Sequence, residues 1–402
     1  MGIDIGTIKN VAQIGVAPSV SSLRQRLGRS GRRKGESAIL WGYVIENEIE
    51  VNSPPKHYLH ENLVQFIAQI RLLIKRWYEP PCIENLHLST FIQQLLSLIA
   101  QYGGLNAAMA WKILCDGGVF QNLNKSDFIL LLRALSEKDI LIQTHDGLLL
   151  HGFAGERIVN DHKFYATFMD EPQYRIINEH RTLGTLSDGK LFEIGDYIIF
   201  AGRRWEVRNI DLERKILDVI PAPAGKIPVF GGSGNFVDDK VRQEMFFVLS
   251  ETNNIPFLDK NAENLLNAAR LEFRRMGLGE RLQTILDIGQ ENILIFHWHG
   301  SRVSHTLCLI LEMYGFETTN QCFYLEVKAS KTNLLMVIKK ILESPLPDEI
   351  SLVMNINFKQ REKWDYLLPE PLLSKNYASS MLDIDGAIVV IKKLLRSLEV
   401  TH

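Results

Sequence analysis

The sequence has few cysteines and no long apolar run, and both shortages limit what it can encode. The four cysteines, Cys82, Cys115, Cys308 and Cys322, show no C-x-x-C spacing, which argues against zinc sites and a disulfide framework. No apolar stretch reaches the length of a membrane span, and no signal peptide is visible. We therefore expect a cytoplasmic protein with reduced cysteines, no membrane partner and no metal site of its own.

The sequence also lacks an excess of charge of one sign, because its acidic and basic residues nearly balance. The formal net charge is -2, with 46% hydrophobic and 23% charged residues, which is typical of a globular protein. A length of 402 residues predicts several domains. This near-neutral net charge argues against a uniformly basic protein, but it is compatible with a local basic groove.

One local charge excess stands out at the start of the chain. Residues 1–34 carry seven lysines and arginines against a single acid, Asp4. Within this stretch, Gly28 and Gly31 flank Arg29, and Arg32 follows directly. The planar guanidinium group matches phosphate better than an ammonium group does. From arginine and glycine alone, a solvated basic turn or a nucleic-acid patch is the favoured interpretation.

The pairing of two short sequences changes this interpretation. GIDIG at residues 2–6, followed by QRLGRSGRR at residues 25–33, resembles motifs V and VI of superfamily 2 helicases. The resemblance implies that motif VI arginines reach the ATP phosphates across a cleft, and that motif V couples nucleotide to nucleic acid. By position, it assigns the arginine fingers to Arg29 and Arg32. The other nucleotide-site residues that it implies are Gly2, Asp4, Gly6, Gln25 and Gly28.

A helicase motor also needs a first RecA-like lobe, and its signatures are missing from these 402 residues. No G-x-x-x-x-G-K-[ST] phosphate loop is present, and no acidic pair fits the magnesium-binding motif. We therefore expect the C-terminal part of a helicase, from a split gene or a truncated reading frame. ATP and Mg²⁺ would bind only with a first lobe supplied in trans or upstream.

The rest of the chain predicts a multidomain α/β and α+β architecture. Residues 1–80 are expected to hold the remnant of a second RecA-like lobe, with a buried strand at 37–44. Residues 81–152 have the pattern of a winged helix, with three helices and a hairpin turning at Asp146-Gly147. Its third helix carries Arg133 as a candidate nucleic-acid contact. Because that helix has few basic residues, a packing module is an equally good interpretation.

Residues 153–250 are rich in short strands, a pattern that predicts a small antiparallel β-barrel. In this region Arg203 and Trp205 alternate along one strand and are expected to share a face. An exposed tryptophan beside an arginine can stack on a base of a single strand. The alternative is that Trp205 belongs to the core and the arginine is solvated.

Residues 251–402 predict a mixed α/β domain. A metal site is suggested by His297, His299 and His305, but no acid or cysteine lies at ligand spacing. We therefore favour a polar strand end, and the functional alternative is a loop that contacts nucleic acid. Together with FAGRRWEV at 200–207 and FHWHGSRVSHTL at 296–307, the domain order resembles the large helicase-related (Lhr) group.

The Lhr resemblance implies an ATP-dependent 3′-to-5′ helicase that acts on single-stranded DNA or RNA:DNA hybrids, in DNA repair or related metabolism. It also implies that the winged helix and the barrel line the single-strand channel. Two alternatives remain open for this chain. One is a stand-alone nucleic-acid-binding protein without ATPase activity, and the other is a protein-interaction subunit.

Overall fold

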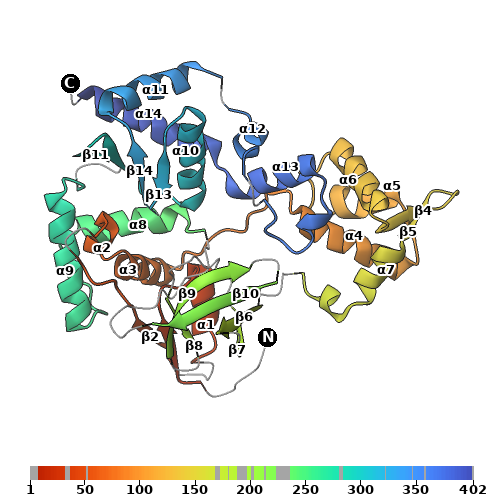
Figure 1. Cartoon of the computed structure of the whole chain (residues 1–402), viewed down its shortest axis with the longest axis horizontal. Coiled ribbons are helices and arrows are strands. Elements are labelled where there is room, and N and C mark those ends of the chain that lie inside the picture. The colour runs from red at the N-terminus through yellow and green to blue at the C-terminus, as the bar shows by residue number, and fades with distance from the viewer. Residues whose placement is uncertain are drawn as a thin grey trace.

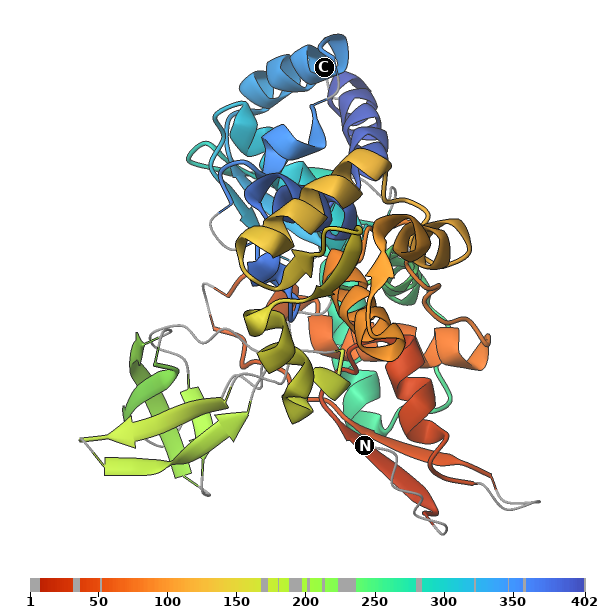
Figure 2. The ribbon, with the colours of Figure 1, turned by 90° about the vertical axis from the view of Figure 1, so that its right-hand side faces the viewer.

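In the computed structural model, the described part of the chain folds into helices around four small sheets (Figures 1 and 2). None of the described helices is both long and apolar enough to cross a membrane. The described residues are 8–31, 37–50, 53–167, 173–179, 181–187, 197–200, 203–211, 214–222, 236–279, 284–321, 323–345, 347–356 and 359–400.

The N-terminal segment forms a parallel strand pair with a helix between the strands and a longer helix behind them. The strands pair in register, from Asn10 opposite Ile39 to Ile14 opposite Tyr43. The longer helix contributes Phe66 to a small core with Leu23. The elements are β1 (Asn10–Ile14), α1 (Val20–Leu27), β2 (Ile39–Tyr43), α2 (Pro55–Tyr58) and α3 (Glu61–Ile74).

The expectation of a buried strand at 37–44 is wrong in one respect. Strand β2 forms, but Trp41 and Tyr43 are each 56% exposed, and Ile14 on β1 is 67% exposed. Strands of parallel sheets are normally covered on both faces. Leu40 packs against the small core on one face of β2, whereas no described segment covers Trp41 and Tyr43 on the other face.

Residues 88–160 form a module of helices with a three-stranded sheet in the order β3-β5-β4. Its core is built around Phe91, whose ring meets Phe120 and Phe128 edge-on, with centroids 5.1 and 5.9 Å away. The elements are α4 (Leu88–Tyr102), β3 (Leu105–Asn106), α5 (Ala107–Trp111) with a π-helical turn (Lys112–Asp116), α6 (Lys125–Glu137), β4 (Leu141–Gln143), β5 (Leu148–His151) and α7 (Phe153–Asn160).

The core of this module is completed by residues from near the C-terminus. Trp364 is buried there, its backbone N–H donating to Ser89 Oγ at 2.9 Å and its Nε1 to Gln93 Oε1 at 2.9 Å. Lys375 pairs with Asp127 at 2.7 Å. The module and the C-terminal part of the chain therefore share one hydrophobic core.

The strand-rich region is an open sheet rather than the expected antiparallel barrel. Its order is β7-β6-β10-β9-β8, and the pairing of β10 with β6 is parallel. Within the described residues, β7 and β8 are edges that do not pair with each other. A barrel requires that closure, because it removes both edges. The strands are β6 (Gln173–Asn178), β7 (Arg181–Ser187), β8 (Tyr197–Phe200), β9 (Arg203–Asp211) and β10 (Ile216–Pro221).

The remaining residues form a mixed α/β unit around an antiparallel sheet in the order β11-β12-β14-β13. Helices cover both faces, which explains the continuous apolar run of β12: Ile293 and Ile295 face one core, Leu294 and Phe296 the other. The elements are α8 (Asp239–Ser250), α9 (Lys260–Arg275), β11 (Thr284–Gly289), β12 (Asn292–Phe296), α10 (Ser301–Met313), β13 (Thr318–Asn320), β14 (Tyr324–Lys328), α11 (Lys331–Glu343), α12 (Glu349–Val353), α13 (Glu370–Met381) and α14 (Ile384–Val400).

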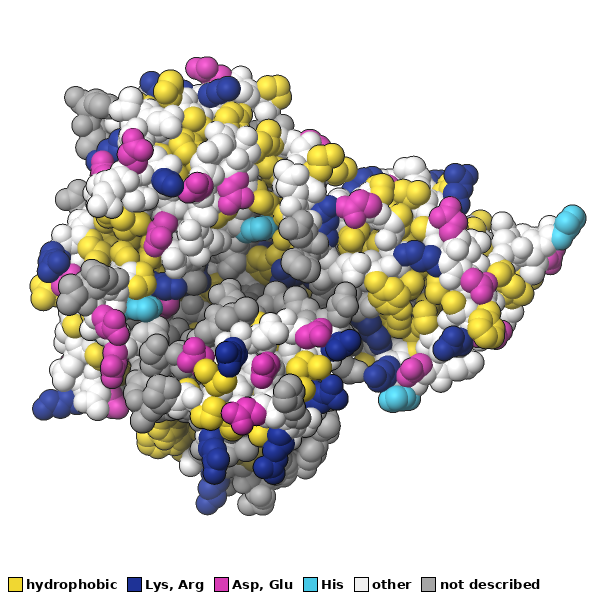
Figure 3. Space-filling view, in the orientation of Figure 1, with side chains coloured by type: hydrophobic (Ala, Val, Ile, Leu, Met, Phe, Trp, Pro, Cys, Tyr) yellow, Lys and Arg dark blue, Asp and Glu magenta, His cyan; other side chains and the backbone are white. Residues whose placement is uncertain are grey.

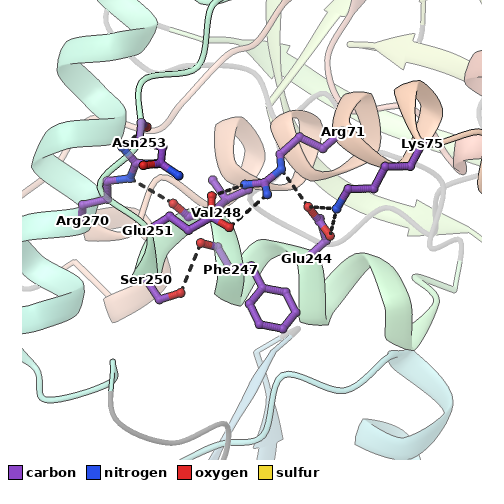
Figure 4. A network of polar contacts seen from close by, with 9 residues as sticks. All are labelled: Arg71, Lys75, Glu244, Phe247, Val248, Ser250, Glu251, Asn253 and Arg270. Carbon is purple, nitrogen blue, oxygen red and sulfur yellow. Dashed lines mark hydrogen bonds and ion pairs between the residues drawn. The ribbon is translucent and has the colours of Figure 1, made fainter.

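A polar network joins α3 of the N-terminal segment to α8 and α9 (Figure 4). Arg71 contacts Glu244 at 2.8 Å and Glu251 at 2.8 Å, and Lys75 adds a second contact to Glu244 at 3.0 Å. The side chain of Glu244 is only 4% exposed, so its charge requires these partners. The network fixes the N-terminal segment, which carries the basic stretch, to the C-terminal unit.

Candidate nucleotide and nucleic-acid interface

Helix α1 presents the arginines of the basic stretch because its apolar face is anchored. Ser19 caps the helix by accepting the backbone N–H of Ser22 at 2.9 Å, while Leu23 is fully buried. Arg24, Gln25 and Arg26 lie on the opposite, exposed face. The predicted residue Gln25 therefore faces solvent in the described structure.

A carboxylate from a distant segment completes the start of α1. Glu79 accepts from the backbone N–H groups of Val20 and Ser21, each at 2.8 Å, and from the Ser21 hydroxyl at 2.9 Å. These N–H groups have no partner inside the helix, and the helix dipole favours negative charge there. Sequence reasoning missed this role, because Glu79-Pro80-Pro81 reads only as a domain boundary.

A surface pocket of about 440 Å³ lies between β1 and the end of α1. Arg26 and Arg29 line it together with Gln13. Gln13 is buried, accepts from Arg26 Nη1 at 2.6 Å and donates from Nε2 to the carbonyls of Ile14 and Gly15, at 3.0 and 3.1 Å. Gln13 thus orients one arginine, while Arg29 is exposed and has no ion-pair partner among the described residues.

The turn after α1 holds the backbone of Arg29 in place. The N–H groups of Gly28, Arg29 and Ser30 each donate back to carbonyls of α1, at 2.9 to 3.0 Å. Gly31 then adopts a φ of +63°, and a Cβ there would lie 2.6 Å from the backbone N of Ala38. Gly31 is therefore the glycine that this backbone requires, whereas Gly28 has an ordinary helical φ of -64°.

The predicted nucleotide site lies only partly within the described residues. Gly2, Asp4, Gly6 and Arg32 lie outside the described residues. Gln25, Gly28 and Arg29 lie inside them and share one helix and its following turn. In the described part of the site, Arg26 and Arg29 line an open surface hollow. No group of three His, Cys, Asp or Glu that could bind a metal ion is found among the described residues.

The predicted nucleic-acid contacts are spread over two units. Arg133 is exposed on α6 and Arg203 is exposed at the start of β9. Trp205 is 7% exposed and belongs to the apolar cluster of the five-stranded sheet, with Val207, Leu217 and Val219. Burial of Trp205 is what the core alternative predicts, while its proposed stacking on a base stays a prediction.

The histidine-rich loop after β12 is a buried structural feature. His297 is fully buried, and its Nδ1 accepts the backbone N–H of His299 at 3.0 Å. The proton of neutral His297 must then sit on Nε2, which lies 3.1 Å from Ser304 Oγ. Burial lowers the pKa of His297 to about 3, so the ring is neutral at pH 7. It therefore holds Ser304 in place and cannot accept its proton as a general base.

The fold of this chain is similar to that of a solved helicase structure. The helicase Lhr of Mycobacterium smegmatis, solved bound to ssDNA and AMP-PNP, matches 98% of this chain with a TM-score of 0.54 and 15% sequence identity. The match covers 54% of that chain, so this chain spans about half the length of the helicase. No protein-family model and no curated protein matches the chain by sequence.

Two structures of the DUF1998 helicase MrfA show weaker likeness. The complex with DNA and AMPPNP matches 87% of this chain and 48% of its own, with a TM-score of 0.29 and 12% identity. The complex with DNA matches 99% and 50%, with a TM-score of 0.30 and 13% identity. These two likenesses are too weak to carry an argument. The match to Lhr, at 15% identity, concerns the fold: over almost its whole length, this chain folds like a part of the Lhr structure, the group that its sequence motifs resemble.

Proposed function

We propose that this chain is the C-terminal part of an ATP-dependent 3′-to-5′ helicase that acts on single-stranded DNA or RNA:DNA hybrids in DNA repair or related metabolism. The observation that carries the proposal is the match in fold to Lhr over 98% of the chain. The sequences at 2–6 and 25–33, which resemble helicase motifs V and VI, support it independently.

In this proposal the pocket beside α1 faces the phosphates of ATP. Arg29, exposed and held by the turn after α1, and Arg32 act as the arginine fingers. ATP supplies a phosphoryl group whose departure develops negative charge, and a fixed guanidinium stabilises that charge. Gln13 holds Arg26 at the pocket wall. The ligands of Mg²⁺ would come from a first lobe, together with the phosphate loop.

The exposed face of β1 and β2 supports the need for that lobe. Ile14, Trp41 and Tyr43 are more than half exposed on a parallel strand pair. Because parallel sheets are stable when both faces are covered, we propose that further α/β structure packs here. That structure would bring the missing lobe, in trans or from upstream, next to Arg29.

The other units form the proposed single-strand channel. In this proposal residues 88–151 act as a winged helix, with α6 as its third helix and with β4 and β5 as its wing; the order of helices and strands supports this interpretation. Arg133 on α6 and Arg203 on β9 would contact phosphates. Such contacts give affinity without sequence preference.

A second candidate is a nucleic-acid-binding protein without ATPase activity, which the absence of a phosphate loop from these 402 residues favours. Binding of single-stranded DNA across a salt series, followed by ATPase assays with and without an added first-lobe polypeptide, tests both. DNA-stimulated turnover only in the mixture supports the helicase. Salt-dependent binding with no turnover in either supports the second candidate, and the absence of binding contradicts both.

A further inference from the structure

The module of residues 88–160 and the short segment after it carry two aromatic rings that the fold turns outward. Tyr165, in a 3₁₀ turn (His162–Tyr165), is 97% exposed, and Phe153 at the start of α7 is 69% exposed. The two rings lie on neighbouring elements, α7 and the turn that follows it. The guanidinium of Arg157 lies 6.0 Å from the centre of the Phe153 ring.

The backbone on both sides of Tyr165 is firmly held. Phe164 packs into the module core, and its carbonyl accepts from Gln93 Nε2 at 2.7 Å. The ammonium of Lys363 donates to the carbonyl of Lys163, within the turn, and to that of Ala166, directly after it. The same ammonium lies 4.7 Å from the centre of the Trp364 ring. Tyr165 thus projects from a rigid base, so little backbone entropy is lost when a ligand covers its ring.

The surroundings of these rings favour an anionic ligand. Helix α7 and the five-stranded sheet lie side by side in both ribbon views (Figures 1 and 2). Figure 3 shows Lys and Arg side chains on both sides of the boundary between them. Among the acids in the described residues of 173–222, Glu179 is exposed, whereas Glu206, Asp211 and Asp218 are partly buried. The exposed cations there are Arg175, Arg181, Arg203, Arg208, Arg214 and Lys215.

From this geometry we infer that Tyr165, supported by Phe153, is a base-stacking platform for single-stranded nucleic acid, with its phosphates directed toward the basic sheet. The inference deepens the proposed nucleic-acid-binding function and rests on it. A base has an apolar face for the exposed ring and brings a phosphate for the cations, and stacking of this kind tolerates any sequence. It assigns the stacking role to Tyr165, in place of the buried Trp205.

The test is a double-mutant cycle that combines a substitution of Tyr165 with removal of the bases from the DNA. The full chain and its Tyr165→Ala and Tyr165→Phe variants are titrated with fluorescent oligo-dT, and with an oligonucleotide of equal length whose bases are removed. We expect Tyr165→Ala to weaken binding to oligo-dT on the order of 5- to 150-fold. On the abasic strand it should cause little change, and Tyr165→Phe should bind oligo-dT like the wild type.

Controls separate this inference from the proposed function. Tyr102→Ala removes another exposed tyrosine, 52% exposed on α4, and should not change binding. Tyr165→Leu keeps an apolar side chain but has no stacking ring, and it should lose as much oligo-dT binding as Tyr165→Ala. It serves as the test if Tyr165→Ala proves less stable than the wild type. Normal oligo-dT binding by Tyr165→Ala and Tyr165→Leu overturns the platform but leaves the proposed function standing. An absence of binding by the wild-type chain overturns both.

Discussion

The carboxylate of Glu79 lies across the first turn of α1, where it accepts both the backbone N–H and the hydroxyl of Ser21, at 2.8 and 2.9 Å. These contacts join residues 58 positions apart in the sequence. The helix that presents Arg26 and Arg29 is therefore held at its N-terminus by the segment that leads into the next module.

Glu79→Gln should loosen this attachment. The amide keeps one acceptor but places an N–H₂ group against a backbone donor, and hydrogen bonds to a charged acceptor contribute about 1.5–3 kcal/mol. Amide hydrogen exchange of α1 should accelerate by about 10- to 150-fold. Glu84→Gln, at an exposed position nearby in sequence, is the control. Equal exchange in both variants would show that Glu79 does not hold the helix.

Arg29→Ala should abolish turnover in a preparation reconstituted with a first lobe. An arginine finger contributes about 10³- to 10⁵-fold to the rate of phosphoryl transfer, so the expected loss is of that order. Arg32→Ala should behave in the same way. Arg24→Ala, exposed on α1 but outside the pocket lining, should retain activity. Wild-type rates in Arg29→Ala and Arg32→Ala would refute the finger assignment, and DNA binding should persist in both variants.

Trp205→Ala should act mainly on stability. The side chain is packed with Val207, Leu217 and Val219 in the core of the five-stranded sheet. Replacing a buried tryptophan by alanine leaves a cavity and typically costs about 3–5 kcal/mol. Thermal melting and DNA binding are measured on the same sample, at a temperature where the variant is folded. A folded variant with weakened binding would instead support direct stacking by Trp205.

Arg71→Met should weaken the attachment of α3 to α8. Glu244 would keep its buried charge with Lys75 as its remaining partner in the network, and loss of one partner of a buried pair costs about 3–5 kcal/mol. Because Arg71 is partly exposed, we expect a loss in the free energy of unfolding near the lower end of this range. Urea unfolding measures it. The double variant Arg71→Met, Glu244→Met should recover part of the loss. A single variant as stable as the wild type would contradict the role of this network.

Glu46 should make stability fall as pH rises toward neutrality. Its Oε1 accepts the backbone N–H of Leu63 in α3, and burial, with a smaller contribution from the charge of Glu61, raises its pKa from 4.5 to about 7. Between these values the folded chain binds more protons than the unfolded chain, so stability decreases with pH. Glu46→Gln keeps the acceptor and removes the titration. Its stability relative to the wild type should therefore be greater at pH 8 than at pH 4, and a constant difference would contradict the shift.

Local sequence determined much of the secondary structure and the likeness to helicase motifs. Apolar periodicity predicts α6 and α11 to within a residue or two, because a helix depends on residues three and four positions apart. Local sequence signals gave wrong predictions where a residue from another part of the chain supplied a competing contact, or where a different element formed. The sequence predicts Ser89 as the N-cap of α4, but Ser89 lies inside the helix and accepts from the backbone N–H of Trp364. The sequence also predicts a strand at 349–357, yet the described residues there begin with helix α12, which Asp348 caps.

Only the tertiary structure decided which of these elements are covered. The apolar run of β2 has the composition of a buried strand, yet Trp41 and Tyr43 are exposed because no described segment packs over them. Trp364 completes the core of a module that begins 276 positions earlier, at Leu88. Exposure of Tyr165 likewise depends on Gln93 and Lys363, which hold the backbone on both sides of it. Burial depends on partners remote in the chain, and a local pattern cannot specify which partners the fold brings together.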